Sequence, residues 1–516
     1  MYTLGDISRK GFAIHRNRVA MVFDNRNITY GELEDRVNRL ANVLLGLGLK
    51  KGDRVTIMAE NTFKYIEVYF GAAKAGLSVT PLNYRLSDKE LAYIINDSEA
   101  TVFFAGDGQE QRTIGLKSDL KGIRYWISLD NEVEGFMFHE NLLAKASGID
   151  PMVDVDENEV AILMYTGGTT GLPKGVMLSH RNLLTGHYAL IIGYSLTRND
   201  TTCFSLPMFH VAIWPVICLL MMGGKSVILP RPDVGKILET IQNERCTHMV
   251  LVPTVLQWLV DDPRANQFDL SSLRLITYAG SPMPLQVLKR CMDKFGPILA
   301  QGYGMTEAAP FVTVHFADDH VLEGPRSRLL GSVGKVGVCV KSRVVDEDDH
   351  VLPPGEIGEI CIRGKNIMKG YWKNPELTAQ ALRGGWLHTG DVGMIDEEGY
   401  IFLMDRKADM IITGGENVYP AETEDILYQH PAVGECAVVS APDDKWGERV
   451  QAVVVFKEGQ SATEKELIDH CKGKLAGYKC PKNVEFWKEL PKTSVGKILR
   501  RDVKKRFWDP PKDAES

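Results

Sequence analysis

Hydrophobic and polar positions in the first half of the chain alternate between two spacings. In ITYGELEDRVNRLANVLLGLGL (28–49), apolar residues recur every three or four positions, which predicts an amphipathic helix. The turn KKGD (50–53) follows and leads into the apolar run VTIM (55–58), which predicts a buried strand. The same order recurs at 65–83 and at 235–255. We therefore expect an α/β fold in which helices cover parallel sheets.

The pattern changes after Gly331 to short strands separated by turns, and changes again after Asp405. We expect a large N-terminal domain at 1–404 that includes a β-rich subdomain at about 331–404, a hinge at 405–409, and a small mobile α+β C-terminal domain at 410–516. The elements expected in the small domain are helices at PAETEDILYQHP (420–431) and TEKELIDHCKGKLAG (463–477), and strands at ECAVVSAP (435–442) and VQAVVVFK (450–457). The charged end WDPPKDAES (508–516) is expected to fray.

Composition adds little beyond a globular class. With 44% hydrophobic and 25% charged residues, the chain is close to the average for folded proteins, and its net charge of -7 offers no basic face for nucleic acid. The longest apolar run, 211–222, is shorter than the roughly 18 residues of a membrane span and is expected to be a buried segment. The basic cluster at 500–506 is expected to be a solvated helix, with weak membrane-surface contact as an alternative.

Cysteine usage and the N-terminus both favour a cytoplasmic location. The nine cysteines are scattered and never spaced CxxC, which indicates reduced thiols rather than disulfides or a zinc site. Asp6, Arg9 and Lys10 interrupt the apolar stretch that a signal peptide would need, so no export is expected.

The segment YTGGTTGLPKGV (165–176) has the composition of a phosphate-binding loop. It follows the apolar strand VAILM (160–164) and precedes a helical pattern at 180–190. Its glycines let the backbone approach a ligand closely, its hydroxyls are donors, and Lys174 adds a positive charge. Gly175 after that lysine rules out the GxxxxGK[ST] pattern, and a Gly/Thr-rich surface turn is the alternative. The candidate phosphate ligands are Thr166, Gly167, Gly168, Thr169, Thr170 and Lys174.

This loop resembles the signature loop of the adenylate-forming superfamily, which includes acyl-CoA synthetases, luciferases and the adenylation domains of peptide synthetases. That family usually has Ser where this chain has Gly168. Other segments are similar to the family's motifs in the same order: LPMFHV (206–211), YAGSP (278–282), QGYGMTE (301–307), WLHTGD (386–391), DRKADMIITGGENVYPAE (405–422) and PKTSVGKILRR (491–501). The resemblance implies an ATP-dependent, AMP-forming ligase that activates a carboxylic acid as an acyl-adenylate and transfers the acyl group to coenzyme A (CoA).

Residue chemistry within these motifs suits nucleotide binding. Glu307 is a lone carboxylate of the kind that shares Mg²⁺ with phosphates, and Thr306 can donate to the α-phosphate. Tyr303 offers a flat face to adenine. Asp391 has two acceptor oxygens for the ribose hydroxyls, and Arg406 a planar donor group. The nucleotide contacts that the resemblance implies are Gly280, Ser281, Pro282, Gln301, Gly302, Tyr303, Asp391 and Arg406.

Lys497 lies in a glycine-flanked loop, where a lysine is ordinarily a solvated surface charge. The resemblance implies instead that it enters the active site from the small domain and bridges the acyl carboxylate and phosphate during adenylation. Two steps at one site require the small domain to turn. At the expected pivot this chain has Ala408, where the family commonly has Asp or Lys.

Transfer to CoA is implied by a smaller set of residues. The small residues of GGEN (414–417) resemble the lining of a pantetheine tunnel, and Trp446 can stack on the CoA adenine. Cys480 stands where some relatives have an arginine. The CoA contacts implied are Gly414, Gly415, Glu416, Trp446, Tyr478, Lys479 and Lys482.

The residues expected around the acid are apolar, which favours a hydrophobic monocarboxylate and leaves fatty, alicyclic and aromatic acids open. His210 is expected to gate this pocket, whose lining is Val211, Trp214, Ala279, Gly304, Met305 and Pro310. His187 is expected to be an ordinary helix histidine. Two alternatives stay open: a stand-alone adenylating enzyme that serves a carrier protein, and a noncatalytic nucleotide-binding scaffold. Homodimers are common in the family.

Overall fold

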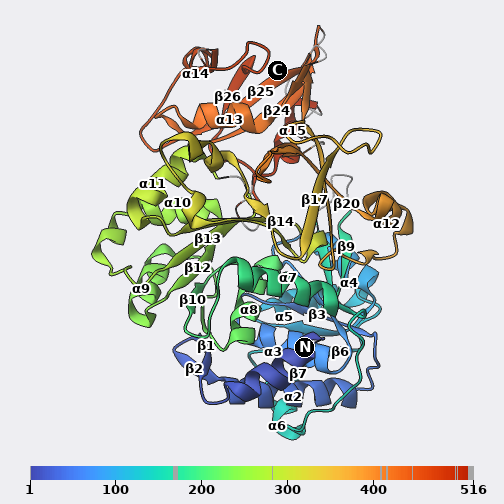
Figure 1. Cartoon of the computed structure of the whole chain (residues 1–516). Coiled ribbons are helices and arrows are strands. Elements are labelled where there is room, and N and C mark those ends of the chain that lie inside the picture. Colours follow the sequence, from blue (N-terminus) through green and yellow to red (C-terminus); the bar gives the residue numbers. More distant parts are fainter. Residues whose placement is uncertain are drawn as a thin grey trace.

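The structure is a computed structural model of the 516-residue chain. It describes residues 2–166, 172–281, 283–406, 409–413, 416–443, 445–472, 474–493, 496 and 498–508, without the side chains of Asp405 and Arg406. A large N-terminal domain contains three sheets, and a small C-terminal domain contains the fourth. Figure 1 shows the small domain, in orange and red, at one end of the molecule.

The first large sheet has nine strands in the order β16-β15-β14-β13-β12-β10-β11-β1-β2. Its central strands, from β14 to β1, are parallel, whereas β2, β15 and β16 are antiparallel additions at the edges. The strands are β1 (Val19–Phe23), β2 (Arg26–Thr29), β10 (Thr201–Phe204), β11 (Lys225–Ile228), β12 (His248–Leu251), β13 (Leu275–Ala279), β14 (Leu299–Gly304), β15 (Phe311–His315) and β16 (Lys335–Val336).

The second large sheet has eight strands in the order β19-β9-β8-β4-β3-β5-β6-β7. It is parallel from β8 to β7, and β9 and β19 extend it in antiparallel pairing. The strands are β3 (Arg54–Met58), β4 (Ser78–Pro81), β5 (Ala100–Ala105), β6 (Tyr125–Ser128), β7 (Met137–Phe138), β8 (Val160–Thr166), β9 (Lys174–Ser179) and β19 (Gly370–Tyr371).

Helices cover both sheets and also pack between them. Helix α7 contacts β9 of one sheet and β15 of the other, and it packs against α8 (Figure 1). The helices of this part are α1 (Leu4–Asp6), α2 (Tyr30–Gly46), α3 (Lys64–Lys74), α4 (Asp88–Ser98), α5 (Gln109–Leu116), α6 (His139–Lys145), α7 (His180–Gly193), α8 (Trp214–Met222), α9 (Val234–Glu244), α10 (Pro253–Asp261) and α11 (Leu285–Phe295). Across the described ranges, no helix combines the length and apolar character that a membrane crossing needs.

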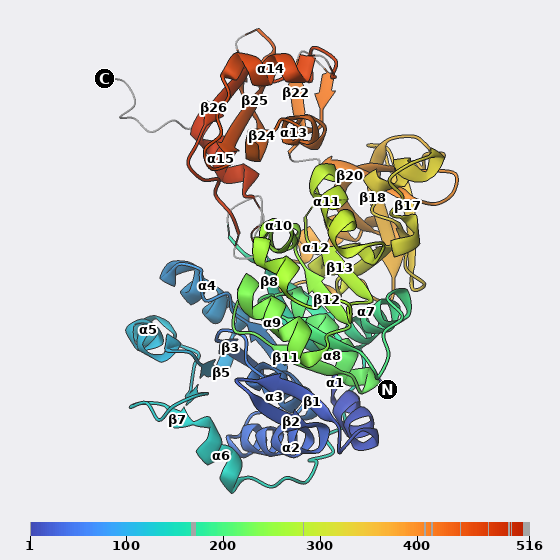
Figure 2. The same cartoon turned by 90° about the vertical axis from the view of Figure 1, so that its left-hand side faces the viewer.

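The remaining elements form the β-rich subdomain and the small domain. The subdomain is an antiparallel sheet of β17 (Val340–Val345), β18 (Gly358–Gly364), β20 (Leu387–Ile395) and β21 (Ile401–Arg406), with helix α12 (Pro375–Ala381). The small domain contains β22 (Ile411–Thr413), β23 (Glu416–Val418), α13 (Pro420–Tyr428), β24 (Val433–Asp443), β25 (Gly447–Phe456), α14 (Glu464–Lys472), β26 (Asn483–Phe486) and α15 (Arg500–Trp508). Figure 2 shows it standing over α10 and α11.

The predicted order of helices and strands is confirmed. The helix-to-strand pairs fall at α2–β3, α3–β4 and α9–β12, and the elements expected in the small domain are α13, α14, β24 and β25. The apolar run 211–222 is largely helix α8, and Pro215 lies in its first turn, where a missing N–H costs little. Strand β9 was among the elements not predicted: residues 174–179 form it because pairing with β8 and β19 decides the conformation of this short apolar run.

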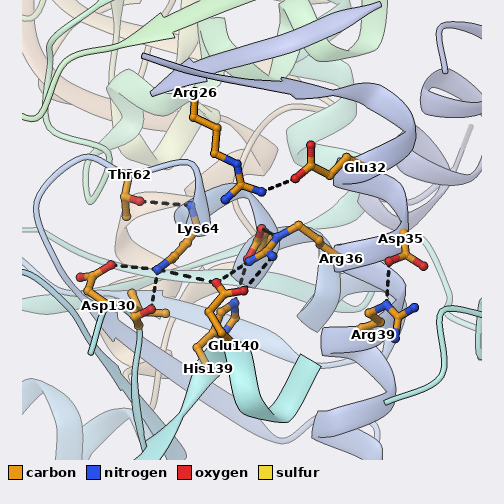
Figure 3. A network of polar contacts seen from close by, with 12 residues as sticks. Arg26, Glu32, Asp35, Arg36, Arg39, Thr62, Lys64, Asp130, His139 and Glu140 are labelled. Carbon is orange, nitrogen blue, oxygen red and sulfur yellow. Dashed lines mark hydrogen bonds and ion pairs between the residues drawn. The ribbon is translucent and has the colours of Figure 1, made fainter. Parts of the chain in front are cut away.

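A buried ion network joins three helices beneath the second sheet (Figure 3). Glu67 on α3 has no exposed side-chain area, and it pairs with Arg36 of α2 and with His139 of α6. Arg36 also forms a 2.7 Å ion pair with Glu140. Burial would raise the pKa of Glu67, but the hydrogen bond and charge of His139 and the guanidinium of Arg36 outweigh it and hold that pKa below its ordinary value. The carboxylate therefore stays ionised in the core.

We expect Glu67→Gln to lower the free energy of unfolding by about 3 kcal/mol at pH 7, because Arg36 loses one of its two carboxylate partners and His139 loses its ionised partner in the core. Because the folded pKa of Glu67 is lowered, its contribution is complete above the ordinary value of 4.5 and is lost as the pH falls below it. Urea unfolding at pH 7 and at lower pH should show the difference from wild type shrinking with acidity.

Glu34→Gln is the matched control, because Glu34 on the same helix as Arg36 pairs with the exposed Arg16. Its effect should stay below about 0.5 kcal/mol. Equal losses in the two variants would contradict a structural role for the buried network.

Candidate functional site

The segments singled out in the sequence gather because parallel strands end at one edge of a sheet. Strands β10, β12, β13 and β14 are parallel neighbours. Residues 206–211 follow β10, residues 280–281 follow β13, and residues 305–307 follow β14. The carboxyl ends of such strands form a ligand-binding crevice in open α/β sheets. This edge is therefore the candidate site.

The glycine-rich loop joins a β-hairpin. Thr166, the last residue of β8, pairs directly with Lys174, the first residue of β9. The loop between them therefore starts and ends at adjacent points, with the lysine at its base. Tyr165 anchors the hairpin by donating its hydroxyl proton to Asp97. The predicted ligands Gly167, Gly168, Thr169 and Thr170 lie outside the described residues.

A tyrosine that sequence analysis missed connects the lysine of this hairpin to the carboxylate of the metal motif. Tyr371, on the two-residue strand β19, pairs with Val176 of β9. Its hydroxyl donates to Glu307 Oε1 at 2.9 Å, and its ring centroid lies 5.2 Å from Lys174 Nζ. A cation, a phenol and a nearly buried carboxylate thus stand in a row.

The residues around Tyr371, 365–372, form what we call the bridging segment. Asn366 Nδ2 donates to the carbonyl oxygens of Ala308 (2.8 Å) and Phe311 (2.9 Å). The backbone N–H of Met368 donates to the carbonyl of Glu307 at 2.8 Å. These three hydrogen bonds connect the bridging segment to the turn that carries Glu307 and hold that turn in place. No motif or periodicity marks this segment in the sequence.

Helix α7 is tied to the same bridging segment. Ser179 ends β9 and caps α7 by accepting from the N–H of Asn182, whose side chain accepts in return from Ser179. Asn182 Nδ2 also donates to the carbonyls of Lys365 and Ile367 at 2.8 and 2.6 Å. The hairpin, the helix after it and the Glu307 turn consequently form one connected unit.

The expected adenine platform and ribose acceptor are in contact. The Tyr303 hydroxyl, at the end of β14, donates to Asp391 Oδ2 on β20. Asp391 is nearly buried, and its strand position pairs with Arg406 of β21. The described coordinates do not extend to the Arg406 side chain. This contact joins the β-rich subdomain to the nine-stranded sheet at the site.

Packing explains several glycines of the motifs. Gly280 has φ +93°, which favours glycine. A side chain at Gly302 or Gly304 would collide with the Tyr194 hydroxyl or the Pro310 carbonyl, respectively. The neighbouring residues of these motifs differ in burial: Ala279, Ser281 and Met305 are half-buried, whereas Gln301 and Thr306 are nearly buried. Pro282 lies outside the described residues.

Exposure falls along the segment expected to border the acid. His210, Val211 and Ala212 are half-buried, whereas Trp214 is fully buried at the start of α8. Asn61, which sequence analysis missed, holds this segment. Its Nδ2 donates to the carbonyl of Leu206 at 2.8 Å, and its Oδ1 accepts from the N–H of Met208 at 2.8 Å. Asn61 is thus a positioning residue for the His210 loop.

The small domain touches the large domain beside the site. The Thr254 hydroxyl, in the first turn of α10, donates to the carbonyl of Gly496 at 3.3 Å. Val252, two residues before Thr254, lies beside Gly280. The residue that precedes Lys497 in the sequence therefore contacts the large domain near the adenine motif. Lys497 itself, and the pivot residue Ala408, lie outside the described residues.

The candidate CoA contacts are on the small domain and do not form one cluster with the nucleotide residues. Trp446 is 46% exposed, with Lys445 Nζ 4.6 Å from its ring centroid. Lys479 forms a 2.6 Å ion pair with Glu422. The Cys480 thiol is buried in the domain core, and burial raises its pKa. Glu416 and Lys482 are exposed and Tyr478 is 38% exposed, whereas Gly414 and Gly415 lie outside the described residues.

The donor set around Glu307 fits magnesium better than a protein-enclosed metal. Within the described ranges, no three His, Cys, Asp or Glu side chains are grouped to hold an ion. Mg²⁺ characteristically takes one or two carboxylates and completes its shell with substrate phosphates and water. Glu307, oriented by Tyr371, meets that requirement. The nine cysteines are free thiols, and all but Cys339 are buried.

Comparisons with known proteins agree over nearly the whole chain. The sequence profile of the family described as AMP-binding enzyme matches residues 9–372, and that of the AMP-binding enzyme C-terminal domain matches residues 422–497. The chain is 40% identical over 482 residues to a feruloyl-CoA synthase of Amycolatopsis sp., covering 93% of this chain and 94% of that one. It is 34% identical over 536 residues to a long-chain-fatty-acid–CoA ligase of Escherichia coli, covering 97% and 94%. ATP-bound MatB from Rhodopseudomonas palustris superposes with a TM-score of 0.88 at 32% identity, covering 97% of this chain and 99% of that one.

Asn366→Ala should loosen the turn that carries Glu307, because the carbonyls of Ala308 and Phe311 lose their buried donor. We expect the free energy of unfolding to fall by about 2 kcal/mol and amide exchange across 305–311 to accelerate. Hydrogen–deuterium exchange with peptide resolution measures this. Asn141→Ala, which removes one exposed hydrogen bond to Glu132, should change neither quantity. Unchanged exchange at 305–311 in Asn366→Ala would show that the bridging segment does not hold the turn.

Proposed function

The chain belongs to the AMP-binding enzyme family and, within the adenylate-forming superfamily, to the AMP-forming acyl-CoA ligases, and on that premise we propose that it converts a hydrophobic monocarboxylic acid, ATP and CoA into an acyl-CoA thioester. AMP and pyrophosphate are the other products. The reaction passes through an enzyme-bound acyl-adenylate. The free thiols of the chain suit a reducing compartment such as the cytosol.

The observation that carries this proposal is the row formed by Lys174, Tyr371 and Glu307 beside the Tyr303–Asp391 contact. It combines a phosphate-binding cation and a magnesium ligand with an aromatic face and a ribose acceptor. Adenylation requires such groups around the phosphates, the ribose and the adenine of ATP. A scaffold that only bound a nucleotide would not need a carboxylate fixed in position next to this lysine and tyrosine.

In the first step, the acid carboxylate attacks the α-phosphorus of ATP, the bond to the bridging oxygen breaks, and pyrophosphate leaves. Lys174 neutralises charge on the phosphate oxygens, and Thr306 donates a hydrogen bond to the α-phosphate. Glu307 would hold Mg²⁺, which would supply further charge neutralisation at the phosphates. Tyr303 stacks on adenine, and Asp391 with Arg406 fixes the ribose. Gly280, Ser281, Pro282, Gln301 and Gly302 border the base.

In the second step, the CoA thiolate attacks the acyl carbonyl and AMP leaves. We assign the small domain to this step, with Trp446 stacked on the CoA adenine and the pantetheine arm passing Gly414, Gly415 and Glu416. Tyr478, Lys479 and Lys482 flank the CoA phosphates. Lys479 must release Glu422 to do so, since the two are paired in this structure.

Because two steps share one site, the small domain has to turn relative to the large domain between them. We propose domains at 1–404 and 410–516, joined by a hinge at 405–409. The contact of Thr254 with Gly496, the residue that precedes Lys497 in the sequence, supports assigning this arrangement to adenylation. A turn about the hinge would then withdraw Lys497 and present the CoA-binding face.

The class of acid is proposed from the residues expected to line the acid pocket. Val211, Trp214, Ala279, Gly304 and Met305 are uncharged, which favours a hydrophobic tail or ring. The two relatives compared above are named for ferulate and for long-chain fatty acids, respectively. Both names fit a hydrophobic monocarboxylate, so aromatic, alicyclic and fatty acids form the panel to be tested.

The direct test is an assay with ATP, Mg²⁺, CoA and this acid panel, with AMP and acyl-CoA measured separately. The proposal expects both products, in equal amounts and only with added acid. AMP formation without a CoA thioester, but with transfer to an acyl carrier protein, would instead identify a carrier-protein ligase. No acid-dependent pyrophosphate release with any acid would favour the scaffold.

Lys497→Ala should reduce acid-dependent adenylation by at least about 100-fold, because a cation next to the reacting carboxylate is lost. Thioester formation from supplied acyl-adenylate should stay within about threefold of wild type, since adenylation is then bypassed. Pyrophosphate exchange and single-turnover thioesterification measure the two half-reactions.

Lys488→Ala, which removes an exposed lysine of the same domain, is the control and should leave both half-reactions unchanged. If Lys497→Ala slows the two half-reactions equally, the lysine does not act specifically in adenylation.

A further inference from the structure

Helix α4 contacts both the glycine-rich hairpin and the bridging segment through one residue near its end. The side chain of Asp97 accepts the Tyr165 hydroxyl at Oδ2, at a distance of 2.5 Å. Its backbone carbonyl accepts from Nε1 of Trp372 at 2.8 Å and from Nζ of Lys373 at 2.7 Å. Asp97 therefore contacts strand β8 and the residues that directly follow Tyr371.

The position of Asp97 in the helix explains why its carbonyl takes these donors. Helix α4 ends at Ser98, and Glu99 follows in the left-handed conformation with φ +54°. Carbonyl groups in the last turn of a helix have no partner within the helix, and a lysine there also interacts favourably with the helix dipole. Trp372 and Lys373 lie 275 and 276 positions further along the chain. The contact is therefore a tertiary one, which ties α4 to the bridging segment.

Gly175, the residue after Lys174, packs against the two aromatic side chains that Asp97 contacts. It pairs with Tyr165 across the hairpin, and its carbonyl accepts from the N–H of Trp372 at 2.7 Å. A Cβ at this position would lie 3.1 Å from Tyr165 Cζ and 3.1 Å from Trp372 Cβ, which is closer than ordinary van der Waals contact. The backbone next to Lys174 is therefore held between residues that are themselves fixed by Asp97.

The Tyr165 hydroxyl acts as a hydrogen-bond donor at physiological pH. Burial raises the pKa of Tyr165 well above its ordinary value, and the hydrogen bond to Asp97 and the charge of that carboxylate raise it further. The proton consequently stays on the phenol. A hydrogen bond to a carboxylate is stronger than one between neutral groups, so this contact restrains the base of the hairpin.

We propose that Asp97 is a positioning residue for ATP, which acts by fixing the base of the glycine-rich hairpin through Tyr165 and Trp372. The inference rests on the proposed ligase function and adds a residue outside the motifs that carry it. Thr166 and Lys174, the residues on either side of the loop, are paired directly beside the Tyr165–Gly175 pair. Preorganised groups lose part of their effect when they are displaced by as little as about 1 Å. A loosened base would thus move Lys174 relative to the phosphates.

The first test is the binding of ATP with Mg²⁺ in the absence of any acid, measured by titration calorimetry. Asp97→Ala should raise the Kd for ATP by about 10-fold, because the lysine is no longer held in place. Asp97→Asn keeps an acceptor oxygen for the Tyr165 hydroxyl and should stay within about threefold of wild type. Tyr165→Phe should match Asp97→Ala, and the double variant should bind no more weakly than either, since both remove one shared contact.

The second test separates the two half-reactions, with an acid from the panel that supports AMP formation. Asp97→Ala should raise KM for ATP in pyrophosphate exchange by about 10-fold, with kcat at saturating ATP within about threefold of wild type. Thioester formation from supplied acyl-adenylate should also stay within about threefold, because pyrophosphate has already left that intermediate. A defect in folding alone would not produce this difference between the half-reactions.

Glu99→Gln is the matched control. Glu99 lies two residues after Asp97 and pairs with Arg54 at 2.9 Å and Lys373 at 3.0 Å, but its side chain is 52% exposed. Exposed ion pairs contribute little, so this variant should leave the Kd for ATP and both half-reactions unchanged. Circular dichroism at the assay temperature checks that each variant is folded. Tyr165→Phe keeps the aromatic ring, so it carries the test if Asp97→Ala does not fold.

The outcomes distinguish this inference from the function on which it rests. A wild-type Kd for ATP in Tyr165→Phe and in folded Asp97→Ala would overturn the positioning role and leave the ligase proposal intact. Equal slowing of the two half-reactions, or an equal effect of Glu99→Gln, would also overturn it. If wild type neither binds ATP nor forms AMP with any acid, both proposals are wrong.

Discussion

The hydrogen bond from Tyr371 to Glu307 is the contact on which the geometry of the site depends. It joins residues 64 positions apart and links the end of the eight-stranded sheet to the turn that follows β14 of the nine-stranded sheet. Because Tyr371 also pairs with β9, the glycine-rich hairpin and the carboxylate cannot move independently. Preorganisation of this kind is what electrostatic catalysis requires, since donors that must rearrange during the reaction lose part of their effect.

The bridging segment extends this constraint into the β-rich subdomain. Asn366 and Met368 support the Glu307 turn from one side, and Asn182 ties the segment to α7 from the other. The Tyr303–Asp391 contact adds a second connection between the subdomain and the nine-stranded sheet. These connections lie within the large domain, and the small domain contacts it beside them through Thr254 and Gly496.

Local periodicity predicted the helix-to-strand pairs α2–β3, α3–β4 and α9–β12, because each buries a continuous apolar face. The motifs, rather than the periodicity, singled out the residues that follow β10, β13 and β14, since motif chemistry is local in sequence. Both missed Tyr371, Asn366 and Asn61, whose roles come from partners far along the chain, and β19 is too short at two residues to produce a pattern. Strand β9 was missed for a related reason: only its neighbours make it a strand.

The close approach of Gly186 to Ala309 separates two kinds of sequence change. Position 186 accepts no side chain, so the distance between α7 and the reaction centre is set by backbone contact alone. Position 187, one residue further, faces the interior without taking part in that contact. A side chain at position 186 would therefore push α7 away from the turn that carries Glu307, whereas an exchange at position 187 would change only the packing of the interior.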